Sequence, residues 1–362
     1  TLAWIPYVEE FRKKHNCKVV CSTFWNQLFV DTYPDITFVS PGTTEHNIAA
    51  LYRLGLFYNN DELDYNAHPI NPIKGPLQKI ASDILGLDHI EIRPKIKQPT
   101  IDNSDSKQVV IALHSSAQTK YWNNPTGWQE VVDWLIAQGY TVKNLSQEHD
   151  GYMGNKNPMG VVQFPPSPIE DVIAEIAKSK MLIGISSGLS WVSWAVGVPT
   201  VMISGFTDPI NEMRDCIRIS APQGKCTGCW HRYKFNPGDW NWCPDHKDTP
   251  RQFECSREIT GETVIRELEK VLKPDTTGYA GPSRQFTMID VVNNNFNNQL
   301  TTTDEAFWNG IYADNKYGWW GANSKSGEGS EGTVAEYKKN VINTIIEKYS
   351  VDSIVDFGCG DF

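Results

Sequence analysis

The sequence lacks the features of several large classes of protein. No stretch of about 20 predominantly apolar residues, the length that spans a bilayer, occurs in it. The N-terminus has no apolar signal core, so we expect a cytoplasmic protein. Basic residues are in the minority, because 43 Asp and Glu outnumber 33 Lys and Arg and give a formal net charge of −10. A surface of that sign argues against nucleic acid as the main partner, because phosphate binding needs basic side chains.

The length and composition predict a globular protein of two or three domains. At 362 residues the chain exceeds one ordinary domain, and 40% of its residues are hydrophobic and 21% charged, as in soluble globular proteins. The chain starts without Met inside an amphipathic pattern, and it stops at VDFGCGDF, which is typical of the middle of a cofactor loop. We therefore interpret it as a fragment of a longer protein.

Residues 1–97 have the pattern of one α/β domain. Apolar residues at helical spacing predict a helix over 1–15, and a second amphipathic pattern predicts a helix over 77–87. Short runs rich in β-branched residues predict strands over 18–24 and 36–42. A repeated order of helix and strand indicates a parallel sheet.

Residues 107–275 repeat that pattern after a polar linker that contains proline. Strands are predicted at the runs QVVIALHSS, TVKNL, GVVQFPP, KMLIGISSG and PTVMISG, and helices over 127–140, 168–179 and 190–197. Ser167 and Glu170 have the spacing of a capping box for the second of these helices. The predicted fold class is therefore α/β with two doubly wound units, and ligands should bind where strands lead into helices.

Four of the eight cysteines lie between residues 225 and 258, a stretch that we call the finger. Cys226 and Cys229 form a Cys-x2-Cys knuckle. Cys243 follows after 13 intervening residues, and Cys255 after a further 11. Four thiolates at such spacings can converge on one metal ion. The finger has few aliphatic residues, so a structural metal, zinc or iron, explains its order better than a core of its own.

Two other interpretations of the finger stay open at this point. The four cysteines could form two disulfides or remain reduced thiols, although no secretory signal favours an oxidising compartment. His231, His246 or Asp245 could replace one thiolate as a ligand, but each is also typical of a solvated loop.

Two loops at the expected ligand-binding edge contain candidates for binding an anion. The first is His114–Trp122, where the first strand of this part gives way to small polar residues. It includes Ser116 and Lys120, whose ammonium group would supply a fixed positive charge. The second, Ser186–Gly188, enters a helix at its N-terminus, where backbone N–H groups and the helix dipole attract an anion. Together the loops predict a diphosphate site. The alternatives are a solvated surface lysine and an ordinary N-cap with a tight turn.

The same loops contain motifs that occur together in one enzyme family. They are K-x-W at Lys120–Trp122 and S-S-G-L-S at Ser186–Ser190, followed by AVGVPTV and FTDP. With the two α/β units, they resemble the GT-B fold of the lipopolysaccharide heptosyltransferases. The finger cysteines and the opening TLAWIPYVEEFRKKHNC resemble more closely the bacterial autotransporter heptosyltransferases. The resemblance spans residues 1 to about 275.

The resemblance implies a glycosyltransferase that uses a heptose-like nucleotide sugar. Residues 1–97 would form the acceptor-side domain and residues 107–275 the donor-binding domain, with a donor of the ADP-heptose type between them. The donor-binding residues that it implies are Lys120, Ser116, Ser186, Ser187, Gly188 and Leu189. The acceptor would be a hydroxyl on a protein or surface glycan, and the chain could form a homo-oligomer.

The chain departs from the family at three positions. The family's Gly-Asp pair, whose Asp the resemblance implies to be the catalytic base, would precede Thr1. We therefore assign no catalytic residue within the chain and expect this fragment to be inactive by itself. Ser186 and Trp191 stand where the lipopolysaccharide enzymes have Asp and His, so the donor contacts should differ.

The implied reaction is direct displacement at the anomeric carbon by an acceptor hydroxyl. The sequence contains no Asp-x-Asp pair that could hold a catalytic divalent metal, so we expect the finger metal to be structural. One alternative is a GT-B transferase with another nucleotide sugar. A second is a non-catalytic module that binds a sugar or a protein partner.

The last part of the chain has a different composition. An Asn- and Thr-rich linker is predicted over 276–300, and a truncated domain over 301–362. Asp356, Gly358 and Gly360 follow a predicted helix and strand, and they resemble the first cofactor loop of class I methyltransferases that bind S-adenosylmethionine. The alternative is a tight turn in another α/β unit.

Overall fold

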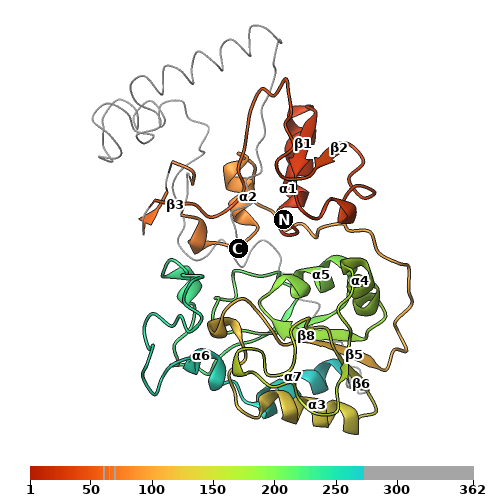
Figure 1. Cartoon of the computed structure of the whole chain (residues 1–362), viewed down its shortest axis with the longest axis vertical. Helices are drawn as coiled ribbons and strands as arrows, with labels where there is room; N and C mark the ends of the chain where they lie inside the picture. The colour runs from red at the N-terminus through yellow and green to blue at the C-terminus, as the bar shows by residue number, and fades with distance from the viewer. Residues whose placement is uncertain (60–61, 65, 69–70, 273–362) are drawn as a thin grey trace, which may run out of the picture. The chain divides into compact units, whose positions relative to one another are not determined.

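The computed structural model describes residues 1–59, 62–64, 66–68 and 71–272, all of which belong to one compact unit (Figure 1). None of the helices among these residues is long and apolar enough to cross a membrane. The predicted linker over 276–300, the methyltransferase segment over 301–362 and its residues Asp356, Gly358 and Gly360 lie outside the described residues. The division into separate domains stays a prediction.

The N-terminal part has a small parallel sheet beside two helices. Strand β1 (Val19–Ser22) pairs in parallel with β2 (Ile36–Val39), as the sequence predicts. The other elements of this part are α1 (Ile5–His15), α2 (Lys79–Ile84), the antiparallel pair β3 (Tyr58–Asn59) and β4 (Glu62–Leu63), and the 3-10 turns η1 (Asn26–Leu28) and η2 (Pro72–Lys74).

The rest of the unit is built on a six-stranded parallel sheet with the order β10-β9-β8-β5-β6-β7. Its strands are β5 (Gln108–Ala112), β6 (Thr141–Asn144), β7 (Val162–Gln163), β8 (Met181–Ile185), β9 (Thr200–Ile203) and β10 (Ile217–Ile219). The chain reverses its direction of travel across the sheet between β5 and β8. In doubly wound folds a ligand site lies at such a point, at the carboxyl ends of the strands.

Helices cover both faces of this sheet (Figure 1). Helices α4 (Ile169–Ala177) and α5 (Gly188–Val196) pack together on one face, and α3 (Gly127–Ala137) and α7 (Gly261–Leu272) on the other. Side chains alternate between the faces as strand geometry requires. Val109 and Ile111 belong to the core beneath α3 and α7, whereas Val110 belongs to the core on the α4 side.

The elements agree with the predicted pattern, with four additions and one error. The pair β3–β4, strand β10 and the helices α6 (Glu254–Arg257) and α7 were not predicted. The predicted capping box is wrong, because Pro168 occupies the N-cap of α4 and makes no side-chain cap bond. The Ser167 hydroxyl instead donates to the Pro165 carbonyl at 2.8 Å. An extended Pro168, with φ −52° and ψ 151°, leaves Ser167 one residue too early to cap the helix.

The finger packs closely against the loop that follows β9. The N–H of Gly228 donates to Gly205 O at 2.9 Å, and the N–H of Trp230 donates to Phe206 O at 3.1 Å. Gly228 has φ +70°, and a Cβ there would lie 2.2 Å from Asp208 Oδ1, so only glycine fits. A Cβ at Gly205 would lie 2.3 Å from Cys255 O. The chain therefore needs both glycines to bring the finger against the sheet.

Candidate functional site

A cavity of about 310 Å³ lies at the carboxyl edge of the six-stranded sheet, between this sheet and the N-terminal part. It is lined by Thr1, Leu2, Ala3, Trp4, Leu56, Leu77, Lys120, Ser186, Ser187, Gly188, Trp191, Phe206, Thr207, Asn211 and Trp230. We call it the cleft cavity. Its volume is at the lower end of the range for small-molecule sites, about 300–1,000 Å³.

The structure brings four of the six predicted donor-binding residues together in the lining of this cavity. They are Lys120, Ser186, Ser187 and Gly188. Ser116 lies outside the lining but accepts a hydrogen bond from Lys120 Nζ at 3.2 Å. Leu189 also lies outside it and packs against the core on the α4 side. The two loops therefore meet as the strand order requires.

Lys120 is a cation held against aromatic rings. It ends the 3-10 turn η3 (Gln118–Lys120), and its Nζ lies 5.7 Å from the ring centre of Phe206 and 5.2 Å from that of Phe235. Burial lowers the pKa of Lys120, because desolvation disfavours the ammonium form. Among the described residues no carboxylate pairs with it. A half-buried ammonium without a counter-charge favours binding of an anion.

The N-terminus of α5 supplies the second half of the site. Ser187 is the N-cap, with extended backbone angles of φ −149° and ψ 175°, and its hydroxyl makes no cap hydrogen bond within the helix. The first backbone N–H groups of a helix have no intrahelical partner, and the dipole adds partial positive charge there. A helix N-terminus and the Lys120 ammonium thus line one cavity.

A buried ion pair lies behind Ser186, and the sequence analysis missed it. The Glu212 carboxylate is fully buried, forms a salt bridge with Arg218 and accepts a hydrogen bond from Ser186 Oγ at 2.7 Å. It also accepts from the hydroxyl of Thr207, another residue of the cavity lining. The only sequence signal was a Glu in the loop after β9 and an Arg in a strand that was not predicted.

The finger braces the loop that contains Lys120. The N–H of Gln118 donates to the finger residue Trp240 at its carbonyl oxygen, 3.0 Å away. Asn123 Nδ2 donates to Ser256 Oγ at 2.9 Å. Trp122 Nε1 donates to Ile259 O, just beyond the finger, at 2.8 Å. The position of Lys120 therefore depends on the finger as well as on β5.

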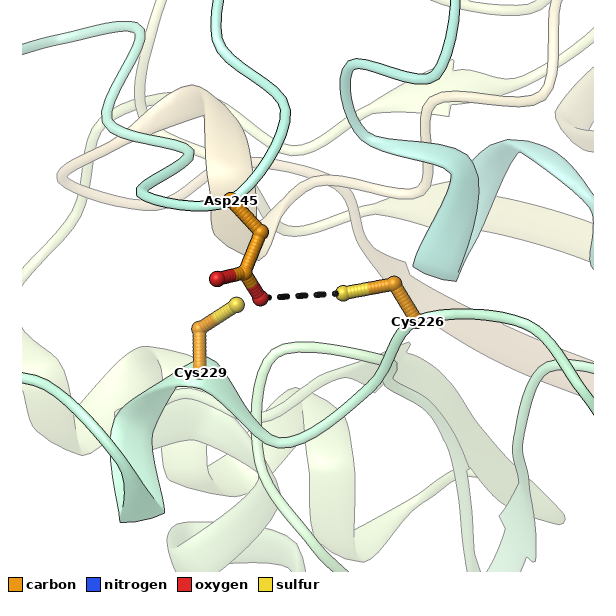
Figure 2. A group of neighbouring side chains, drawn as sticks. All are labelled: Cys226, Cys229 and Asp245. Carbon is orange, nitrogen blue, oxygen red and sulfur yellow. Dashed lines mark hydrogen bonds between the residues drawn. The ribbon is translucent and has the colours of Figure 1, made fainter.

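Within the finger, Cys226, Cys229 and Asp245 bring their ligand atoms within 4.8 Å of one another (Figure 2). Asp245 is held by hydrogen bonds from Arg232 Nη2 at 2.5 Å and from Tyr233 Oη at 2.6 Å. The bond from Tyr233 is the main reason why the pKa of Asp245 is lowered, and Arg232 adds to the effect. Arg232 Nη2 also lies 3.6 Å from Cys226 Sγ and 3.5 Å from Cys229 Sγ.

Cys243 and Cys255 lie outside that 4.8 Å group. The Cys255 thiol nevertheless interacts electrostatically with those of Cys226 and Cys243. All four finger cysteines are free of disulfides, so the disulfide interpretation is wrong for them. Burial raises the pKa of Cys226 and Cys229, and it raises that of Cys255 to about 12. Neighbouring thiols add to the shift of Cys229 and Cys255. Sulfur ligands crowded together in this way fit a soft metal cation, which would stabilise their thiolates.

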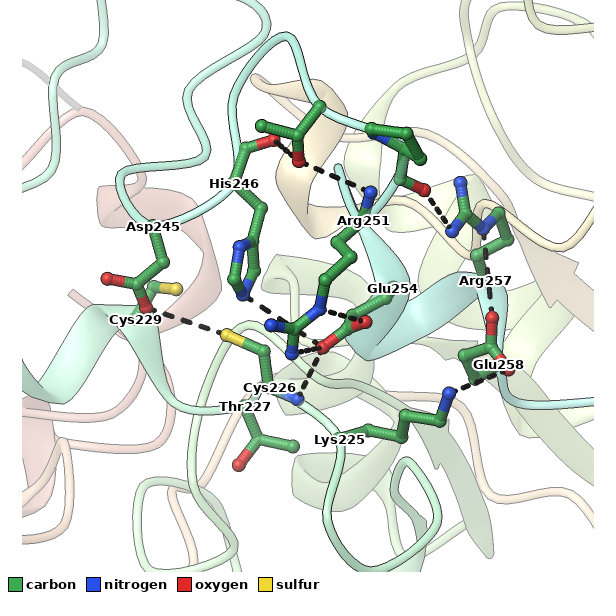
Figure 3. A network of polar contacts seen from close by, with 12 residues as sticks. Lys225, Cys226, Thr227, Cys229, Asp245, His246, Arg251, Glu254, Arg257 and Glu258 are labelled. Carbon is green, nitrogen blue, oxygen red and sulfur yellow. Dashed lines mark hydrogen bonds and ion pairs between the residues drawn. The ribbon is translucent and has the colours of Figure 1, made fainter.

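A polar network lies beside this cluster (Figure 3). Glu254 Oε1 accepts from the backbone N–H of Cys226 at 3.0 Å, and Glu254 Oε2 accepts from Arg251 Nε at 2.9 Å. Hydrogen bonds from Arg251 lower the pKa of Glu254 to about 2, so this carboxylate is charged over the whole ordinary pH range. Lys225 and Glu258 form a further ion pair at 3.4 Å. The network fixes the backbone at the first cysteine of the knuckle.

Comparisons with known proteins agree with this geometry. The family described as glycosyltransferase family 9 (heptosyltransferase) matches residues 78–227. The autotransporter heptosyltransferase Aah of Escherichia coli is 38% identical over 283 residues, which cover 75% of this chain and 71% of Aah. The chain belongs to the autotransporter heptosyltransferase family. The family predicted from the sequence motifs is therefore confirmed.

Solved structures of the family member TibC confirm the GT-B fold. TibC of enterotoxigenic E. coli H10407 is described as an iron-containing dodecameric glycosyltransferase. Its structure matches with a TM-score of 0.69 and 35% identity over 75% of this chain and 72% of TibC. A second TibC structure contains ADP-D-beta-D-heptose. BimC of Burkholderia thailandensis, 31% identical over 75% of this chain and 65% of BimC, is named an inactive autotransporter heptosyltransferase.

The Glu212–Arg218 pair predicts a large effect on stability. We expect Glu212→Ala to lower the free energy of unfolding by about 3–5 kcal/mol, because Arg218 would remain buried without a counter-charge. The double variant Glu212→Leu/Arg218→Met should recover most of that loss, because it buries no charge. Urea unfolding of the three proteins measures both effects. A loss below about 1 kcal/mol in the single variant would show that the pair is not desolvated.

Proposed function

We propose that this chain is the donor-binding and transfer unit of a heptosyltransferase that uses ADP-heptose. The observation that supports this most directly is the cleft cavity, where Lys120 and the N-terminus of α5 meet. A diphosphate has the negative charge that both groups attract. The TibC structure with ADP-D-beta-D-heptose adds a relative that binds this donor.

The reaction is displacement at the anomeric carbon of the heptose. The acceptor oxygen forms a bond to this carbon while the bond to the diphosphate oxygen breaks, and a carboxylate takes the proton of the acceptor hydroxyl. Negative charge then builds on the departing ADP. Lys120 and the backbone N–H groups of Gly188 and Leu189 would stabilise that charge. Ser186 and Ser187 would orient the diphosphate with their hydroxyls, Ser186 being held by Glu212.

The finger supplies structure to this reaction and no chemical step. Cys226, Cys229, Cys243 and Cys255 would hold one metal ion as thiolates, and Asp245 would remain an outer partner, held by Arg232 and Tyr233. The ion would cross-link a segment that has few aliphatic residues. The description of TibC as iron-containing favours iron over zinc for this chain.

The acceptor would be a hydroxyl of a protein or surface glycan, modified in the cytoplasm, and the enzyme would form a homo-oligomer, as TibC does. The methyltransferase predicted over 301–362, with its cofactor S-adenosylmethionine, stays a prediction. A second candidate function is a non-catalytic module that kept the donor site, and the name of BimC gives this alternative its support.

Substituting Lys120 tests the proposed donor site. We expect Lys120→Ala to weaken the binding of ADP by about 10- to 100-fold, because a charged hydrogen-bond partner of the diphosphate is lost. Turnover with ADP-heptose in the full-length protein should fall by about 100- to 1,000-fold. Calorimetry and a donor-hydrolysis assay give the two values.

The matched control is Lys178→Ala, which removes a lysine that pairs with Glu175 on the surface of the opposite edge of the sheet. It should bind ADP and turn over as the unmodified protein does. Near-normal transfer by Lys120→Ala would exclude Lys120 from the diphosphate site. ADP binding without any transfer in the full-length protein would favour the non-catalytic module.

Metal content tests the proposed ligand set. The full-length protein should contain about one iron or zinc ion per chain, measured by atomic emission. Cys226→Ser and Cys243→Ser should lose most of it, because each removes a thiolate ligand. Cys17→Ser in the N-terminal part is the control and should retain it. Full metal content in Cys243→Ser with loss in Asp245→Asn would replace the four-thiolate set by Cys226, Cys229 and Asp245.

A further inference from the structure

One short turn of the finger contacts three different parts of the molecule. It is η5 (Cys229–His231), a single 3-10 turn. Cys229 belongs to the thiol cluster and packs with Phe206 and Trp242 in a small apolar core. Trp230 lines the cleft cavity, and His231 points to the N-terminal part. Three consecutive residues thus join the thiol cluster, the cleft cavity and the N-terminal part.

The contact to the N-terminal part consists of two hydrogen bonds around η2. His231 Nδ1 donates to the backbone carbonyl of Ile73, and Lys74 Nζ donates to the carbonyl of His231 at 3.2 Å. The turn η2 is itself capped, because Asn71 Oδ1 accepts from the N–H of Ile73 at 3.2 Å. The carbonyl that receives the imidazole is therefore held in a fixed position.

The chain that follows η2 enters the wall of the cleft cavity. Leu77 lines the cavity, and its N–H donates to the carbonyl of Asn211, another lining residue, at 3.0 Å. The two parts of the chain are thus joined at Leu77–Asn211 and again at Ile73–His231. The segment between these two bonds, residues 73–77, sets the position of Leu77 relative to Trp230 on the other side of the cavity.

The protonation of His231 follows from its partner. A carbonyl oxygen only accepts, so Nδ1 carries the hydrogen and the ring is the neutral Nδ1–H tautomer or the cation. Its residue is only 4% exposed, and Nε2 has no partner among the described residues. Nε2 is also absent from the group of clustered metal-ligating atoms. The imidazole therefore makes one hydrogen bond, which its Nδ1 donates to the N-terminal part at Ile73 O.

We infer that the finger is a latch between the two halves, closed by His231 and Lys74, which holds the wall of the donor cavity in its binding shape. The inference rests on the proposed function for the identity of the donor, but the latch itself is a property of the fold. His231 is accordingly a positioning residue. Through Cys229 and Trp230, ordering of the finger by its metal is transmitted to the cavity.

Two substitutions separate the hydrogen bond from the imidazole. His231→Asn keeps an N–H group at the position of Nδ1 and removes Nε2, whereas His231→Leu fills the site without a donor. Lys74→Met removes the second bond, and Lys247→Ala is the control, because Lys247 is an exposed finger residue whose partner, Asp239, also lies in the finger. All four variants are made in the full-length protein.

Three measurements follow for each variant: ADP affinity by calorimetry, metal content, and amide hydrogen exchange of residues 71–78. We expect His231→Leu to weaken ADP binding by about 3- to 10-fold and Lys74→Met to weaken it less. Exchange of 71–78 should become faster in both, with the metal content unchanged. His231→Asn and Lys247→Ala should behave as the unmodified protein does in all three measurements.

Two results would overturn the latch. Unchanged exchange and ADP affinity in His231→Leu would show that the contact does not hold the cavity wall, and loss of metal in His231→Asn would show that the imidazole is a metal ligand. If His231→Leu fails to fold, Lys74→Met and His231→Asn still decide the question. Failure of the unmodified protein to bind ADP would contradict the proposed function, whereas the exchange data would still test the latch.

Discussion

The half-buried ammonium of Lys120 is the constraint on which the site depends. Its pKa is lowered by desolvation, it lies against Phe206 and Phe235, and it has no carboxylate partner among the described residues. Holding a cation in this way is unfavourable unless an anion arrives. The parallel sheet supplies the rest of the site, because the loops after β5, β8 and β9 all begin at the same edge.

The finger explains how such an arrangement is kept in place. Phe235 lies beside the lysine, and the carbonyl of Trp240 receives the N–H of Gln118 at the start of its turn. On the other side, His231 reaches the N-terminal part. A segment with few aliphatic residues can only provide such fixed contacts if something else orders it, and the clustered thiols of the finger are suited to do so through a metal.

Much of the fold could be predicted because it depends on local patterns. The β-branched runs gave β1, β2, β5, β6, β8 and β9, and the order of strands and helices placed Lys120 and Ser186–Gly188 at one edge. The predicted capping box failed for a local reason. Pro168 is extended and takes the N-cap position, so Ser167 lies one residue before the position from which it could cap the helix.

The parts that could not be predicted depend on contacts between distant residues. Glu212 and Arg218 form a buried pair only because β9 and β10 are neighbours, and a single sequence does not reveal that pairing. His231 and Ile73 are 158 residues apart. The approach of Asp245 to Cys226 and Cys229 likewise depends on the course of the finger, which has little regular secondary structure.

Proton uptake on ADP binding tests the central role of Lys120 most directly. Calorimetric titrations of the full-length protein are run near pH 9.5, in buffers with different ionisation enthalpies. A lysine whose pKa is lowered in the free protein is partly neutral at this pH, and the bound diphosphate raises its pKa again, so it takes up a proton. We predict a binding heat that depends on the buffer in the unmodified protein and no such dependence in Lys120→Ala. A binding heat independent of the buffer, or an equal dependence in both proteins, would contradict the account.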